Sequence, residues 1–181
     1  MKHLKDLYLE HEQRITDYIP EIKHVDLWSE QIGFLAEEHF FKAPATFFAY
    51  RILNTEDQGD RIQQLRMQVE VYLYYETFAD SSRGSKKQST ALAFLDLLTK
   101  INACFHATGG QTFYNMKRTG FNPVETGTAN LLYVQRYECT VNDDSATILT
   151  IPTKFEEMEV EVGNAMPPNT EEGSCLYDKI N

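Results

Sequence analysis

Apolar side chains recur three and four positions apart between Leu4 and Ile19. This spacing places them on one face of an α-helix, so the segment predicts an amphipathic helix. Pro20 should end it, because the proline ring and the missing N–H disfavour a further turn. The apolar stripe consists of Leu4, Leu7, Tyr8, His11, Ile15, Tyr18 and Ile19.

Two later segments have the composition and alternation of strands. Thr46–Ile52 is rich in aromatic and β-branched residues, which favour strands. In Leu65–Tyr75 apolar residues alternate with polar residues and tyrosines, which predicts one buried face and one polar face with a tyrosine strip. The polar stretch Asn54–Asp60 predicts the turn of an antiparallel hairpin. Val25–Gln31 is too short to type, and we expect a short strand or an ordered connection there.

A second helix is expected near Lys86, since Ser85 and Gln88 have the spacing of a capping box. Gly109 and Gly110 should supply the left-handed conformations that end it. The helix is expected to form the core of the domain through a wide apolar face, made of Leu92, Phe94, Leu95, Leu98, Ile101, Cys104 and Phe105.

Two further strands are predicted over Thr112–Thr119 and Leu131–Val141, joined by a loop with proline and glycine. The predicted order is therefore helix, strand, strand, helix, strand, strand. This order is typical of an α+β domain in which two helices pack on one face of an antiparallel sheet of about four strands. We assign this domain to residues 1–150.

The composition changes towards the C-terminus, where residues 151–181 are expected to form a partly disordered acidic arm. Seven acidic residues and one lysine lie in Phe155–Asn181, so this segment carries a net charge of −6. Within it, Met158, Val160 and Val162 alternate with glutamates, a pattern that would suit pairing with an open sheet edge.

The whole chain of 181 residues has a formal net charge of −10. Such a charge repels phosphate backbones and anionic lipids, so binding to nucleic acid or to a membrane surface is not expected. No apolar run is long enough to cross a bilayer, and the N-terminus lacks the pattern of a secretory signal, which predicts a cytoplasmic location. The three cysteines, an odd number at wide separations, predict no disulfide framework.

Motifs for catalysis, metal binding and cofactor binding are missing from the sequence. His11 and Glu12 are followed by Ile15 where a zinc-protease helix would have its second histidine. Gly84, Ser85 and Lys86 lack the remaining residues of a phosphate loop, and there is no nucleophile elbow. We therefore expect no catalytic residue, no metal, no cofactor and no enzymatic activity.

The remaining candidates are surfaces for subunit contact. Four tyrosines, Tyr72, Tyr74, Tyr133 and Tyr137, are predicted to form an aromatic strip. Such a strip would stack bases, pack on another subunit, or cover the domain's own core. A basic connector consists of Arg83, Lys86 and Lys87, and we hypothesise that it meets the Glu156–Glu161 segment of a neighbouring copy. The candidate interface residues are Trp28, Tyr72, Tyr74, Arg83, Lys86, Lys87, Glu157 and Glu159.

The predicted order of elements resembles that of the tail terminator, or tail completion, proteins of long-tailed bacteriophages and prophages. Three stretches of the sequence are similar to those of this family: Val25–Gln31, Pro44–Phe48, and Arg136 and Tyr137 leading to Asp143–Ala146. The likeness covers about residues 1–146, and the acidic C-terminal segment departs from the compact family pattern.

The resemblance implies a structural virion protein that assembles as a ring, typically of six copies, on the head-proximal end of the tail tube. There it would stop tube growth and present a surface to head-connector proteins, after assembly in the host bacterial cytoplasm. It implies no catalytic residue. The alternatives are another phage neck or connector protein, and a sheet module that binds a small ligand or nucleic acid through the tyrosine strip.

Overall fold

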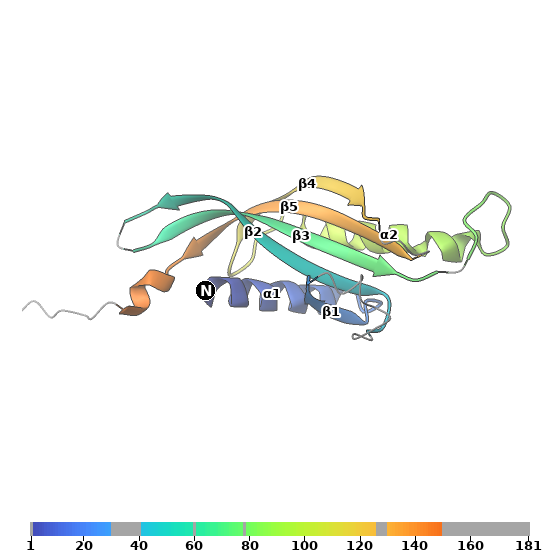
Figure 1. Ribbon diagram of the computed structural model, residues 1–181, viewed down its shortest axis with the longest axis horizontal. Helices are drawn as coiled ribbons and strands as arrows, with labels where there is room; N and C mark the ends of the chain where they lie inside the picture. The colour runs from blue at the N-terminus through green and yellow to red at the C-terminus, as the bar shows by residue number, and fades with distance from the viewer. Residues whose placement is uncertain (1, 30–40, 60, 78, 126–129, 150–181) are drawn as a thin grey trace, which may run out of the picture. The chain divides into compact units, whose positions relative to one another are not determined.

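The computed structural model describes residues 2–29, 41–59, 61–77, 79–125 and 130–149 (Figure 1). The predicted acidic arm, with Glu157 and Glu159, lies outside these residues. The elements, in chain order, are α1 (Lys2–Tyr18), β1 (His24–Leu27), β2 (Ala45–Asp57), β3 (Gln63–Tyr75), α2 (Gln88–Phe105), β4 (Tyr114–Pro123), β5 (Leu131–Asp143) and a short 3-10 helix (Ser145–Leu149). No helix in the described part of the chain is long and apolar enough to span a membrane.

Within the described residues the sheet has five strands, in the order β1-β2-β3-β5-β4. The predicted α+β class is confirmed, whereas the expectation of about four antiparallel strands needs correction. The short segment that the sequence left untyped forms β1, which pairs parallel to β2 with Val25 opposite Thr46. All other pairs are antiparallel, including the predicted β2–β3 hairpin.

The hairpin is longer than predicted. Asn54 and the residues up to Asp57 were expected in a turn, yet they continue β2 and pair with Arg66–Gln63 of β3, after a register shift between Ile52 and Asn54. The chain reverses at Gln58–Ile62, where Gly59 has a φ of 80°. Polar side chains form a strand here because the register with β3, rather than burial, holds the backbone in place.

Both helices pack on the same face of the sheet, as predicted, and we call this the helix face. The core between the layers contains residues of both helices and of the three central strands. Of the predicted α1 stripe, Leu7, His11, Ile15 and Ile19 are buried, but Tyr18 is 71% exposed. The fully buried side chains of this core include Leu7, Ile15, Phe48, Met67, Val69, Ile101, Phe105 and Tyr137.

The ends of α2 differ from the sequence-based prediction. Ser85 does not close a capping box: Lys87 is the N-cap residue without a side-chain cap, and the Gln88 amide donates to the carbonyl oxygen of Ser81. The left-handed residue after the helix is Ala107, with a φ of 59°, rather than a glycine. It is held there because its N–H donates to the carbonyl oxygen of Met116 in β4.

Two side chains of α1 fix the segment between α2 and β4. The Glu10 carboxylate accepts hydrogen bonds from the backbone N–H groups of Gln111 and Thr112, at 3.0 and 2.9 Å. Arg14 donates to the carbonyl oxygens of Cys104 and Gly109. A β-carbon at position 110 would overlap the Glu10 carboxylate, which explains why a glycine stands at this position.

His11 lies fully buried in the helix-face core. Its ring packs against four aromatic rings, and its Nδ1 lies 3.1 Å from the hydroxyl oxygen of Tyr50. Burial, with a smaller contribution from the charge of Arg14, lowers the pKa of His11 to about 3. The neighbouring rings are those of Phe48, Tyr50, Phe105 and Phe113. The folded protein therefore keeps this imidazole neutral in mildly acidic solution.

We predict that acid destabilises the fold through His11. The unfolded chain binds a proton at His11 below its ordinary pKa of 6.5, whereas the folded chain does not bind it until about pH 3. The stability present above pH 6.5 is therefore lost as the pH falls, by about 2 kcal/mol between pH 7 and pH 5. Urea unfolding at both pH values measures this loss.

The His11→Leu variant should lose most of this pH dependence, because nothing remains to be protonated at that position. The His24→Asn variant, changed at a partly exposed histidine, should retain it. Equal pH dependence in wild type and His11→Leu would contradict the assignment.

Candidate functional site

The second face of the sheet, which we call the outer face, carries its own aromatic cluster at the β1 end. Trp28, just after β1, stacks on Tyr72 with ring centroids 4.2 Å apart and an angle of 7° between the planes. Tyr74 is fully buried beside them, under Phe41. The cluster also contains Ala45, Phe47, Leu132 and Val134. It forms a second small core on the face that was predicted to be polar.

The predicted tyrosine strip is therefore wrong. Tyr133 and Tyr137 lie on the helix face, since β5 pairs them with Leu73 and Val69 of β3, whereas Tyr72 and Tyr74 lie on the outer face. Adjacent strands in register place paired residues on the same face, so the four rings belong to two opposite layers. The sequence alone does not reveal this register.

The hydroxyl groups of the outer-face tyrosines are already engaged. Tyr72 donates to the Glu70 carboxylate and Tyr74 to that of Glu76, both at 2.7 Å. Burial, followed by these hydrogen bonds, raises the pKa of both tyrosines well above the ordinary value. The Asn130 amide also donates to the Tyr74 oxygen at 2.7 Å. These residues build the domain and present little aromatic surface to a ligand.

The basic connector is exposed, in contrast to the tyrosines. Arg83, Lys86 and Lys87 lie in the loop before α2, and all three side chains are exposed. Ser85, which lies between them in the sequence, is half-buried. None of the three has an ion-pair partner among the described residues. Positive charge at the N-terminus of α2 is unfavourable for the helix itself. The pairing of this connector with Glu157 and Glu159 stays a prediction, because both glutamates lie outside the described residues.

At the far end of the β2–β3 hairpin, strand β2 lies outside the helix-face core, although Leu65 of β3, opposite Thr55, belongs to that core. Every residue of β2 from Arg51 to Asp57 is exposed, and Figure 1 shows this end on the left, beyond the first turn of α1. Three aliphatic side chains, Ile52, Leu53 and Ile62, are exposed there. Among the described residues β1 flanks β2 only as far as Phe48, so the outer edge of β2 is open beyond that point.

The opposite edge of the sheet, strand β4, is protected against strand addition. Met116 exchanges backbone hydrogen bonds with the segment after α2, and the N–H of Arg118 donates to Nδ1 of His106. Two register shifts interrupt the strand, and Pro123 at its end has no N–H. Bulges and proline are ordinary devices that block edge pairing. Among the described residues, the edge of β2 is therefore more open to an added strand than the edge of β4.

A groove of about 420 Å³ runs between α2 and β4. Its apolar side chains include Leu95 and Phe121, which are 44% and 45% exposed. Gln135 closes the floor, with its amide donating to the Leu98 carbonyl oxygen at 2.7 Å. Arg118 and Asn102 add polar groups to the lining. Such partly exposed apolar side chains beside a cation are typical of a protein contact surface.

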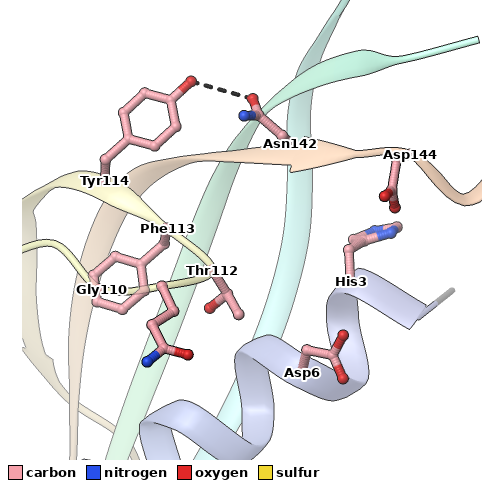
Figure 2. A pocket seen from close by; sticks show the side chains of 9 residues that line it. His3, Asp6, Gly110, Thr112, Phe113, Tyr114, Asn142 and Asp144 are labelled. Atoms are coloured by element: carbon pink, nitrogen blue, oxygen red, sulfur yellow. Dashed lines mark hydrogen bonds between the residues drawn. The ribbon is translucent and has the colours of Figure 1, made fainter.

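A shallow polar pocket of about 230 Å³ lies where the first turn of α1 meets the end of β5 (Figure 2). His3, Asp6 and Asp144 line it, and Nδ1 of His3 lies 2.9 Å from Oδ1 of Asp143. Burial alone would raise the pKa of Asp143, but hydrogen bonds from Ser145 and the contact with His3 lower it. Within the described residues no group of three or more His, Cys, Asp or Glu side chains is placed to hold a metal ion.

The two cysteines in the described ranges are poorly suited to nucleophilic chemistry. Cys104 is partly buried on α2 and Cys139 is buried on β5. Burial raises the pKa of both thiols, and that of Cys139 to about 12. Because the thiolate is the reactive form, both sulfurs are held in their less reactive state at neutral pH.

Comparison with known proteins gives no further guide to this chain. No protein-family model matches it, and no curated protein is significantly similar to it. The surfaces that stand out are therefore defined by geometry. They are the hairpin end and the α2–β4 groove, neither of which was predicted from the sequence. The sequence signal for these surfaces is weak: Leu53 directly precedes the polar stretch Asn54–Asp60, and Phe121 lies beside a predicted loop.

We predict that Tyr74 stabilises the domain through its hydroxyl group. Tyr74→Phe removes the acceptor for Asn130 and the donor to Glu76, so the free energy of unfolding should fall by about 1 to 2 kcal/mol. Urea unfolding measures the change. Tyr18→Phe, at an exposed position, is the control and should change stability by less than about 0.5 kcal/mol. Equal effects of the two substitutions would refute this role.

Proposed function

We propose that this chain is a structural subunit that assembles with copies of itself into a closed ring, and that the ring terminates or completes the tail tube of a bacteriophage. The observation that carries the proposal is the presence of two different contact surfaces at distant places on one sheet. One is the projecting hairpin with its aliphatic side chains, and the other is the α2–β4 groove.

The sheet register gives the separation of the two surfaces. Phe121 in the groove pairs with Gln135, whereas Ile52 lies level with Cys139 and the tip residue Gln63 pairs with Asp143, four and eight positions further along β5. At about 3.3 Å per residue, Ile52 is about 13 Å and the tip about 26 Å from the groove along the strand, and the strands β3 and β5 lie between β2 and β4. A contact between two different surfaces is heterologous, and repetition of such a contact produces a closed ring when the rotation closes.

The stretches that resemble tail terminator proteins include positions that hold strands of the sheet together. Val25 of the first stretch pairs with Thr46 of the second, across β1 and β2. Arg136 of the third binds Glu70 in β3, with Nε of Arg136 2.7 Å from a carboxylate oxygen. These positions are architectural, which suits a family whose implied role is assembly without catalysis.

The resemblance also supplies the biological part of the proposal. It favours a ring of six copies at the head-proximal end of the tail tube, where it meets head-connector proteins. The alternative of a sheet module that stacks bases or a small ligand has lost its main argument, because Tyr72 and Tyr74 are buried and Tyr133 and Tyr137 lie on the other face.

We predict that the purified full-length chain forms a ring. Native mass spectrometry should give a multiple of the 20.9 kDa subunit, with about 125 kDa for six copies, and negative-stain electron microscopy should show annular particles. The physical reason is the pair of complementary surfaces on each copy. A chain that stays monomeric at every concentration tested would contradict the proposal.

A second prediction concerns the tail itself. Deleting the gene from an inducible phage genome that carries it should yield tails of irregular, excessive length without attached heads, because tube growth is no longer stopped. Electron micrographs of the lysate measure tail length and the fraction of tails with heads. A plasmid copy of the gene is the control and should restore both. Normal headed particles without the gene would refute the tail role and leave ring formation to be judged by mass.

A further inference from the structure

The hairpin end combines aliphatic and acidic side chains. Leu53 occupies the register shift between Ile52 and Asn54 and is 42% exposed, with Ile52 and Ile62 also exposed. Glu56 and Asp57 follow on the same strand and are exposed too. Arg51 and Arg61 are exposed at the same end, so the exposed aliphatic side chains lie beside both basic residues and the acidic pair Glu56 and Asp57. Such apolar side chains gain free energy when another protein surface removes them from water.

The α2–β4 groove has the complementary character. Leu95 and Phe121 are partly exposed in its lining, and Phe121 stacks on Tyr133 with centroids 5.5 Å apart, so its ring has a fixed position. Leu92 is exposed one turn before Leu95 on α2. Arg118 also lines the groove, and its side chain is exposed. The groove thus offers apolar surface beside positive charge.

Charge and distance together select the occupant. The negative Glu56 and Asp57 suit Arg118, and the aliphatic residues of the tip suit Leu95 and Phe121. The hairpin of the same copy is not a candidate, since Leu53 lies on β2 level with Cys139 and Thr140, and the strands β3 and β5 hold it apart from β4. A second copy of this chain supplies the same hairpin without that restriction.

We infer that the β2–β3 hairpin of one copy docks into the α2–β4 groove of the next copy. Leu53 packs against Leu95 and Phe121, and the acidic side chains of the tip face Arg118. This inference rests on the proposed ring, and it identifies the contact that builds the ring. The open edge of β2 lies beside Leu53, so backbone pairing with the neighbour is available at the same contact.

The experiment uses one variant for each half of the contact. Leu53→Asp disables the hairpin and leaves the groove intact, whereas Leu95→Asp disables the groove and leaves the hairpin intact. Both side chains are exposed, so the domain should still fold, which circular dichroism and thermal unfolding check. Leu9→Asp, at an exposed leucine of α1, is the matched control and should leave the ring unchanged.

Each variant alone should be a monomer by native mass spectrometry. An equimolar mixture of Leu53→Asp and Leu95→Asp should form a dimer of about 42 kDa, twice the 20.9 kDa subunit, with one copy of each variant. It should form nothing larger, because only one intact hairpin and one intact groove meet in each pair. Isotope labelling of one variant identifies the composition of the dimer.

The charge part of the contact has a separate test. Glu56→Arg and Arg118→Glu should each shift the ring towards monomer, by at least about tenfold in the concentration needed for assembly. A chain that carries both substitutions should recover assembly, because every contact then joins the same two opposite charges with their positions exchanged. Failure of the doubly substituted chain to assemble better than either single variant would overturn this charge pairing.

The outcomes separate the contact from the proposed function. A ring that persists in both Leu53→Asp and Leu95→Asp overturns the hairpin-in-groove contact and leaves the proposed ring standing. Homodimers of either variant alone overturn it as well, since they indicate a contact between identical surfaces. A monomeric wild-type chain overturns both proposals.

Discussion

Burial of β3 on both of its faces organises this domain. In the first half of β3 the buried side chains, Leu65, Met67 and Val69, all lie on the helix face. In its second half the strand is buried on both faces, through Val71 and Leu73 on the helix face and through Tyr72 and Tyr74 on the outer face. A strand that is buried on both faces must have side chains of other elements packed against each face. The helices cover one face, and the aromatic cluster around Trp28 and Phe47 contributes to the cover of the other. The sheet is therefore covered on both faces at one end and on one face at the other.

This difference between the two ends explains where the free surfaces lie. Towards the hairpin end the outer face is polar, and Arg66 pairs with Glu138 across β3 and β5. Arg136 and Glu70 form a similar pair nearer the middle of the sheet. Exposed pairs of this kind contribute little to stability but keep the face soluble and in register. The last residues of β2 extend beyond the helices, and their aliphatic side chains stay in water. They can contact another protein because they are not part of either core of the domain.

The helix-face core is held together by contacts that are distant in the sequence. Glu10 and Arg14 of α1 bind the backbone between α2 and β4, and His11 is enclosed by rings from β2, α2 and the residues before β4. These contacts set α1, α2 and β4 at fixed positions, and with them the two walls of the groove. The rigidity of a contact surface limits the entropy lost on association. The proposed assembly thus depends on interactions within the subunit.

The pattern of the sequence determined the existence of both helices, the β2–β3 hairpin and strand β5, because each buries several apolar positions on the helix face. Strand β4 was predicted as well, although Met116 is its one buried residue. Local pattern also located Arg83, Lys86 and Lys87 on the surface. It did not determine β1, the extension of β2 to Asp57, or the two-faced burial of β3. These three features depend on which strands are neighbours in the sheet. A tyrosine in an alternating pattern can be either exposed to water or buried in a second core. Only the tertiary structure decided that Tyr72 and Tyr74 are buried and that Leu53, Leu95 and Phe121 are exposed, because register and layer order are set by contacts between distant segments.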